Sequence, residues 1–120
     1  MSNLLGGLIP GLRLEKRVLA AQKGNAELRN QLIIDYTPFI KKMVSRQTGR
    51  YIEVDDDWYS LGLMAFNDAI DAYESAKGPF LPFAASVLRN RTIDELRRES
   101  RSRMETPTGS AEENEIQWVY

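Results

Sequence analysis

The chain has 120 residues, 42% of them hydrophobic, and a formal net charge of −1, which allows one compact domain with a buried core. It contains no cysteine and no histidine, which excludes disulfides and the thiolate and imidazole ligands of transition-metal sites. The commonest general base is also missing, so we do not expect an enzyme, and the lack of cysteine favours a cytoplasmic location. The apolar stretch at residues 4–12 is interrupted by glycine and proline and follows no basic cluster, so it predicts neither a signal peptide nor a membrane span.

Charge is segregated along the sequence, although its sum is near zero. Residues 51–76 contain no lysine or arginine, and their acidic residues are Glu53, Asp55, Asp56, Asp57, Asp68, Asp71 and Glu74. A later segment is rich in arginine, with Arg89, Arg91, Arg97, Arg98, Arg101 and Arg103. The pattern predicts a protein with two oppositely charged faces.

Apolar residues recur at helical spacing and none alternate as in a strand, which predicts an all-α fold, a compact bundle of about four helices. The first helix is short and stops at Gly24, after which Asn25 can cap the next helix. The second helix is long and bent and ends near Gly49. Within it, Pro38 removes a backbone donor and should kink the helix or restart it after Thr37.

Two further helices follow. The third begins near residues 55–57, where carboxylates complement the helix dipole, and ends at Gly78-Pro79. The fourth has Pro82 in its first turn and runs to about Met104. We therefore expect an N-terminal lead at 1–13, a helical domain at 14–104 and an acidic linker at 105–120.

The third helix has two dissimilar sides. Its core side carries Tyr59, Leu63, Phe66, Ile70 and Tyr73, with Gly62 and Ala69 allowing close helix packing. Its opposite side carries Asp57, Leu61, Met64, Asp68 and Asp71, with Ser60 and Asn67 at its edge. Apolar side chains among exposed carboxylates predict a partner-binding surface, but single exposed apolar residues are also ordinary on protein surfaces.

The acidic residues could instead suggest a magnesium site. Consecutive positions such as 55–57 diverge by about 100° around a helix and cannot converge on one ion, while Asp68 and Asp71 offer only a pair. We therefore predict no metal and no other cofactor.

The fourth helix buries Ala85, Leu88, Thr92 and Leu96, with Arg89 and Ile93 along one margin. Its other side carries Phe83, Val87, Asn90, Asp94, Arg97 and Arg101, flanked by Ser86, Arg91 and Arg98. Guanidinium groups bind phosphates, an asparagine amide pairs with a base edge and an aromatic ring stacks on an unpaired base, so this stripe predicts nucleic-acid binding. The alternative is that the arginines stabilise the C-terminus of the helix and that Phe83 closes one end of the domain.

Two segments carry a resemblance to a known family. The polymerase-binding helix of sigma-70 family initiation factors is similar to Asp57–Gly78, DWYSLGLMAFNDAIDAYESAKG, with its acidic start, central glycine and closing Lys-Gly. The promoter-melting and promoter-reading helix, in the variant typical of sigma-I factors, is similar to Phe80–Glu99, FLPFAASVLRNRTIDELRRE. The resemblance covers roughly residues 14–103 and corresponds to conserved region two of this family of bacterial transcription initiation factors.

The resemblance implies the region-two fold and two binding surfaces. The surface for the clamp coiled coil of the polymerase β′ subunit would comprise Asp57, Ser60, Leu61, Met64, Asn67, Asp68 and Asp71. Promoter DNA, near the start-proximal element where a base is flipped out, would meet Lys77, Phe80, Phe83, Ser86, Arg89, Asn90, Arg91, Asp94, Arg97, Arg98 and Arg101.

Sigma-I factors are generally held inactive by a membrane-anchored anti-sigma protein, whose cytoplasmic domain would compete for Leu61 and Met64. The linker at 105–120 would lead to a helix-turn-helix domain that these residues do not include. The resemblance implies no small-molecule substrate and no direct insertion into the membrane.

Two alternatives to this interpretation are a protein-binding adaptor and an enzyme. A helical adaptor would use both charged faces to bind proteins only. Because it would bind no nucleic acid, neither Asn90→Ala nor Arg97→Ala would have the effect on DNA binding that an initiation factor should show. A hydrolytic or phosphoryl-transfer enzyme is less favoured, because the sequence has no phosphate-binding loop and no paired nucleophile and base.

Overall fold

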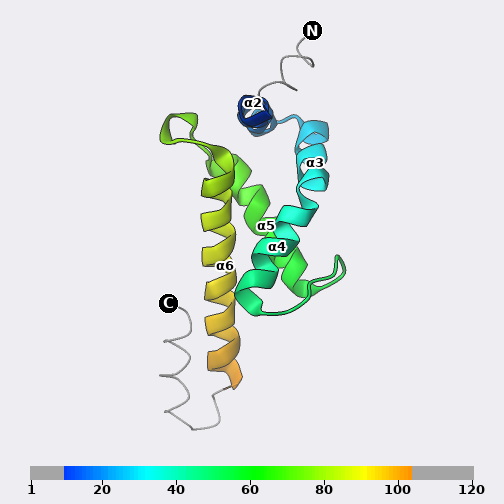
Figure 1. Ribbon diagram of the computed structural model, residues 1–120, viewed down its shortest axis with the longest axis vertical. Coiled ribbons are helices and arrows are strands. Elements are labelled where there is room, and N and C mark those ends of the chain that lie inside the picture. Colours follow the sequence, from blue (N-terminus) through cyan, green and yellow to red (C-terminus); the bar gives the residue numbers. More distant parts are fainter. Residues whose placement is uncertain (1–9, 104–120) are drawn as a thin grey trace.

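The computed structural model describes residues 10–103, with side chains placed for residues 14–102. The elements in chain order are α2 (Pro10–Gln22), α3 (Ala26–Asp35), α4 (Thr37–Thr48), α5 (Asp57–Ala72), the short 3-10 helix η1 (Ser75–Lys77) and α6 (Phe80–Arg103) (Figure 1). Residues 10–103 contain no strand, so the predicted all-α fold is confirmed. Most of the predicted lead at 1–13 and all of the predicted linker at 105–120 lie outside the described residues.

The two longest helices form the centre of the molecule. α5 and α6 run antiparallel, and α4 packs against both of them (Figure 1). α2 lies across the end where α5 stops and α6 begins, beside α3. None of the helices within residues 10–103 is long and apolar enough to cross a membrane.

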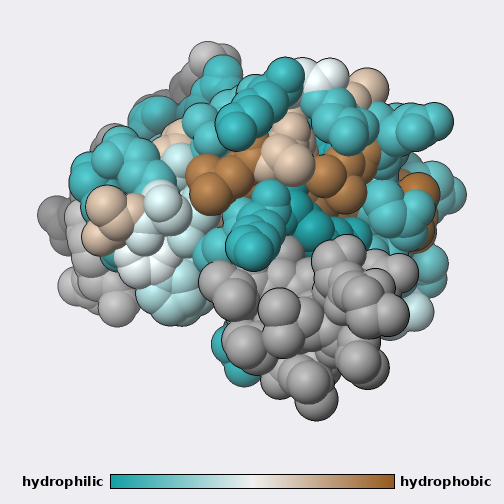
Figure 2. All heavy atoms as spheres, turned by 90° about the horizontal axis from the view of Figure 1, so that it is seen from above, coloured by the Kyte–Doolittle hydropathy of each residue, from teal (hydrophilic) through white to brown (hydrophobic). Residues whose placement is uncertain are grey.

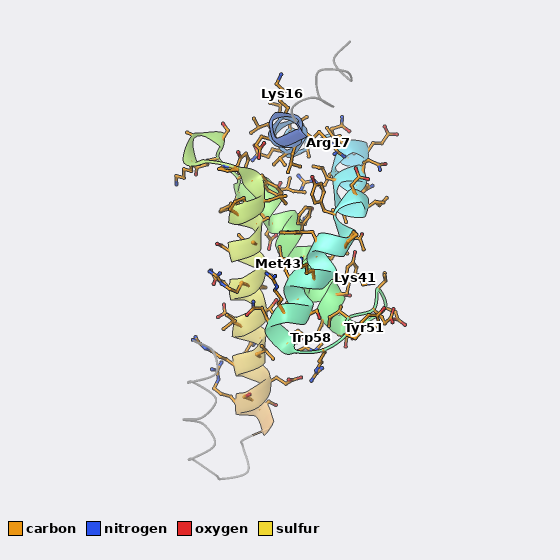
Figure 3. The ribbon with its side chains drawn as sticks, viewed as in Figure 1. Lys16, Arg17, Lys41, Met43, Tyr51 and Trp58 are labelled. Atoms are coloured by element: carbon orange, nitrogen blue, oxygen red, sulfur yellow. The ribbon has the colours of Figure 1, made fainter. Side chains whose placement is uncertain are left out.

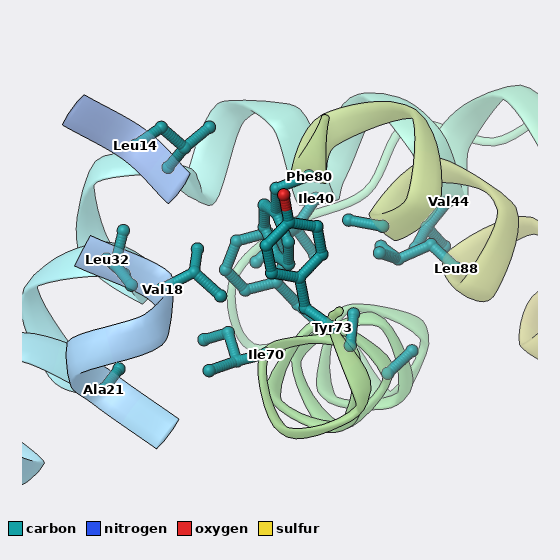
Figure 4. Close-up of a cluster of buried hydrophobic side chains, with 14 of the residues drawn as sticks. Leu14, Val18, Ala21, Leu32, Ile40, Val44, Ile70, Tyr73, Phe80 and Leu88 are labelled. Atoms are coloured by element: carbon teal, nitrogen blue, oxygen red, sulfur yellow. The ribbon is translucent and has the colours of Figure 1, made fainter. Parts of the chain in front are cut away.

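A single core joins all five α-helices. Figure 4 shows residues of α2, α3, α4, α5 and α6 converging on the ring of Phe80, and the labelled side chains include Leu14, Val18, Leu32, Ile40, Val44, Ile70 and Leu88. Each fully buried aliphatic side chain contributes about 1.5–3 kcal/mol. Viewed from the α2 end, the apolar residues that remain visible form small patches separated by hydrophilic ones (Figure 2).

The predicted second helix is two helices. α3 ends at Asp35 and α4 begins at Thr37, so only Tyr36 separates them. Pro38 lies in the first turn of α4, where its missing N–H removes no helical bond, whereas in a continuous helix its ring would meet the carbonyl of Ile34. Of the two expected outcomes, a kink or a restart, the structure has the restart, and it begins at Thr37, just before the proline.

The third helix also ends earlier than expected. It stops at Ala72 rather than at Gly78-Pro79, because Tyr73 adopts an extended conformation with φ −63° and ψ 137°. Its ring then lies in the core, and its hydroxyl donates to the carbonyl oxygen of Gly78 at 2.6 Å. Residues 73–79 thus form a compact connection that contains η1 and leads directly into α6.

α2 holds both ends of this connection. The Gln22 side-chain nitrogen donates to the carbonyl oxygens of Ile70 and Tyr73 at 2.9 and 2.7 Å, which satisfies acceptors at the C-terminus of α5. The Glu15 carboxylate accepts from the backbone N–H of Phe80 at 2.8 Å, at the N-terminus of α6. Two polar side chains of α2 therefore cap the two helices that carry the predicted binding surfaces.

The helical projections were largely right about which side is buried. Of the five core residues predicted for the third helix, Leu63 is half-buried and the other four are buried, including Tyr73, which lies just past the end of α5. On α6, Leu88 and Thr92 are buried, but Ala84 rather than Ala85 completes the row, and Leu96 is half-buried.

Candidate functional site

The outward side of α5 is exposed as predicted. Asp57, Ser60, Met64, Asp68 and Asp71 are exposed, while Leu61 and Asn67 are half-buried. Met64 is 58% exposed, which is high for a large apolar residue. The side chains of this face start at the capped N-terminus of α5, where the Asp56 carboxylate accepts from the backbone N–H of Trp58 at 2.9 Å.

A groove runs beside this face, between α5 and α6. Its volume is about 400 Å³, and its lining comprises Asp57, Trp58, Ser60, Leu61 and Met64 of α5 with Glu95 and Glu99 of α6. Trp58 is buried beneath the groove, and the guanidinium of Arg50 lies 5.7 Å from the centre of its ring. The groove is therefore apolar at its base and acidic at its margin.

Two arginines from other helices reach the C-terminal half of the α5 face. Arg29 of α3 donates to Asp71 at 2.6 Å and to Asn67 at 2.9 Å. Arg91 of α6 forms an ion pair with Asp68. The second pair joins a predicted polymerase-binding residue to a predicted DNA-binding one. Helical spacing could not indicate Arg29, because it lies 42 positions from Asp71 in the chain.

The arginine-rich stripe of α6 is exposed over most of its length. Arg89, Asn90, Asp94, Arg98 and Arg101 are exposed, and Phe83, Ser86, Arg91 and Arg97 are half-buried. Lys77 of η1 is exposed and lies 3.5 Å from the carboxylate of Glu74. All the predicted DNA-binding residues except Phe80 therefore have side chains that solvent reaches.

The expectation that Phe80 meets DNA does not fit the structure, because its side chain is fully buried. Its ring packs edge-on against Phe66 and Tyr73, with ring centres 5.7 and 5.3 Å apart. A side chain enclosed in this way belongs to the core and does not face DNA. The spacing contained the signal, since position 80 precedes Ala84 and Leu88 by four and eight residues and so continues the buried row of α6.

A second hollow lies where α5 connects to α6. It has a volume of about 220 Å³ and is lined by Ala72, Tyr73, Glu74, Lys77, Gly78, Pro79 and Phe83. The rings of Tyr73 and Phe83 lie 6.2 Å apart with their planes tilted by 47°. Burial raises the pKa of the Tyr73 hydroxyl above its usual 10.0, and the charge of Glu15 raises it further, so the hydroxyl stays protonated at neutral pH.

Cationic side chains also occur on the flank away from α6. The Lys41 ammonium of α4 lies 5.9 Å from the centre of the Tyr51 ring, on the loop between α4 and α5 (Figure 3). Tyr51 is 78% exposed, and because it lies in a loop, helical spacing does not single it out. Among the described residues, no group of three or more acidic side chains is placed to hold a metal ion.

Comparison with known proteins shows which family the chain belongs to. The family model for Sigma-70 region 2 matches residues 32–102, which include α5 and most of α6. RNA polymerase sigma factor SigI of Bacillus subtilis (strain 168) is 49% identical over 90 residues, covering 74% of this chain and 36% of that protein. The SigI protein of Bacillus anthracis is 44% identical over 80 residues, covering 66% of this chain and 33% of that protein.

RNA polymerase sigma factor SigI1 of Acetivibrio thermocellus is 44% identical over 75 residues, covering 61% of this chain and 29% of that protein. The chain thus spans about a third of the length of the curated relatives it matches. The resemblance noted in the sequence is confirmed, and the relatives are transcription initiation factors rather than enzymes. The chain belongs to the sigma-70 family of RNA polymerase sigma factors, in which it is of the sigma-I type and comprises region 2.

Proposed function

We propose that this chain is the part of an alternative sigma factor that docks on core RNA polymerase in the bacterial cytoplasm and contacts the start-proximal promoter element. The observation that carries the proposal is the exposed α5 face, where Met64 and Leu61 lie among carboxylates beside a groove of about 400 Å³. An exposed apolar side chain next to a groove is a feature of binding surfaces, and aliphatic anchors of this kind contribute to the centre of an interface.

The two halves of the α5 face play different parts in docking. Asp68 and Asp71 already pair with arginines of the same chain, and a partner must compete with those contacts. The N-terminal half, with Asp57, Leu61 and Met64, offers an apolar centre and the groove. The clamp coiled coil of the polymerase β′ subunit therefore makes its main contacts at this half.

Titration calorimetry with an isolated β′ clamp coiled coil of Bacillus subtilis tests the docking. Leu61→Asp buries a charge in the interface and should weaken binding by at least about a hundredfold, since an unpaired buried charge costs several kcal/mol. Ile34→Asp is the matched control, because Ile34 is a 63% exposed aliphatic residue on α3. Equal binding by the native chain and Leu61→Asp would refute docking on this face, whereas loss in both variants would point to misfolding.

Promoter recognition is proposed at the hollow between α5 and α6. The half-buried Phe83 ring lines this hollow beside the buried Tyr73 and is suited to stack on a single unpaired base, and the exposed Lys77 is suited to a neighbouring phosphate. Extracting a base from the stack costs a few kcal/mol, which stacking and polymerase contacts must offset. Along α6, the exposed Arg89, Asn90 and Arg101 contact the part of the same DNA strand that continues beyond this base.

Selection of single-stranded DNA from a randomised pool, with the chain bound to core polymerase, tests this path. Phe83→Ala should erase the preference at one position of the selected strand, because stacking on one ring contributes about 1–3 kcal/mol per base. Arg101→Ala should weaken binding to all sequences evenly and lower the salt slope by about one. A protein that selects no DNA in this complex would favour the helical adaptor instead.

Regulation by a membrane-anchored anti-sigma protein is the remaining part of the proposal. Its cytoplasmic domain competes with polymerase for the same apolar centre, so Leu61→Asp and Met64→Asp should weaken both interactions. Pull-down of each variant with polymerase and with the inhibitor domain measures this. Inhibitor binding that survives both substitutions would show that the inhibitor uses another surface.

A further inference from the structure

α6 presents two edges of different chemistry. Glu95 and Glu99, one turn apart, line the groove beside α5, whereas Asn90 and Arg101 are exposed on another side of the same helix. Positions four residues apart stay on one side of a helix, so the two glutamates form a continuous acidic edge. The helix assigned to promoter DNA therefore also borders the face assigned to polymerase.

We propose that Glu95 and Glu99 belong to the polymerase-binding surface and that the groove receives an apolar side chain flanked by arginine or lysine residues of core RNA polymerase. This inference rests on the docking proposed above and extends it to α6. The apolar side chain contacts Leu61 and Met64, and the cationic groups meet the carboxylates at the margin.

The lining of the groove fits this occupant. Its base is apolar, formed by Trp58 and Leu61, and Met64 is available to cover an inserted side chain. Its acidic groups stand on both helices, with Asp57 on one and the two glutamates on the other. Carboxylates arranged around an apolar centre are complementary to a helix surface on which cations surround an aliphatic residue.

Other occupants fit the groove less well. No three acidic groups of the described residues are placed to share a metal ion. Nucleic acid is disfavoured because carboxylates repel its phosphates. Glu95 accepts from Arg98 at 3.0 Å, and Glu99 also has an interaction within the chain, so a partner cation competes with contacts already made. The Glu95 pair is exposed and lies within one helix, so its replacement costs little.

The test is the double variant Glu95→Gln, Glu99→Gln, titrated into core RNA polymerase of Bacillus subtilis at several salt concentrations. We expect a Kd about three- to tenfold larger than that of the native chain, and a weaker dependence on salt, because ion pairs at the margin of an interface contribute modestly and are screened. The matched control is Glu27→Gln, Glu53→Gln, which removes the same charge from exposed positions outside the groove and should change the Kd less than about twofold.

The outcomes separate this inference from the docking proposal. If Leu61→Asp abolishes binding while the glutamine variant binds like its control, docking stands and the role of α6 is refuted. If Leu61→Asp has no effect on binding, docking on α5 is refuted, and the role of α6 that rests on it is refuted too. A glutamine variant that binds polymerase normally but binds single-stranded promoter DNA less tightly would place both glutamates in the DNA site and overturn the inference.

Discussion

Gly62→Ala should destabilise the protein, although alanine is the better helix former. An added Cβ at position 62 would lie 2.7 Å from Cγ2 of Val44 and 2.9 Å from Cγ2 of Ile40. Both contacted methyl groups sit on β-branched side chains whose χ1 angles are strongly restricted in a helix, so α4 and α5 must move apart. Overpacking costs about 1–3 kcal/mol, and two contacts below 3.0 Å with restricted side chains put this site in the upper part of that range, at about 2–3 kcal/mol. Alanine recovers about 1 kcal/mol of this through its helix propensity. We expect a net loss of about 1–2 kcal/mol.

Thermal unfolding followed by circular dichroism measures this loss. The melting temperature should fall by about 4–16 °C, taking about 4–8 °C per kcal/mol for a domain of this size. Ser60→Ala, on the exposed side of the same helix, is the control and should change the stability by less than about 0.5 kcal/mol. The double variant Gly62→Ala, Val44→Ala should lose less stability than the sum of the losses in the two single variants, because Val44→Ala removes one of the clashing methyl groups. A Gly62→Ala protein as stable as the native one would refute the close approach of the two helices.

Three further changes test other contacts. Tyr73→Phe removes the hydrogen bond to Gly78 and should cost about 1 kcal/mol at neutral pH. Because the folded state raises the pKa of this hydroxyl, its contribution to stability is complete below pH 10.0 and is lost as the pH rises through the folded pKa. Urea titrations across that range should therefore show a smaller loss of stability at alkaline pH in Tyr73→Phe than in the native chain. Asn25→Ala removes the side-chain cap of α3 and should cost about 1 kcal/mol in the same assay, and an unchanged midpoint would contradict the cap. Arg29→Ala should cost about 1 kcal/mol in low salt and less in high salt, where its pair with Asp71 is screened, and a loss independent of salt would argue for lost packing instead.

Local patterns predicted much of the fold. The stop at Gly24, which has φ 101°, the break before Pro38 and the buried row of α5 follow from turn chemistry and helical spacing. The exposed face with Met64 was also correctly located, because a projection separates the two sides of a single helix. Its assignment to polymerase remains a prediction.

Long-range contacts were beyond the reach of such patterns. Arg29 reaches Asp71 only after α3 has packed beside α5, and spacing along one helix cannot reveal that pair. The end of α5 is likewise capped by Gln22, whose side chain donates to carbonyl oxygens 48 and 51 positions away. Phe80 was assigned to DNA by family resemblance, although its position in the buried row of α6 contradicts that role.

The two caps that α2 supplies bear on where the functional unit begins. The match to Sigma-70 region 2 starts at residue 32, so Glu15 and Gln22 both precede it. A fragment cut at that boundary would keep every residue of the aromatic hollow and yet lose the side chains that anchor the backbone on either side of it. Such a fragment would also lose Leu14, Val18 and Ala21 from the core, so the rings of Tyr73 and Phe83 would no longer be held at a fixed separation. The segment upstream of the family match therefore acts as a brace for the hollow that we propose for promoter recognition.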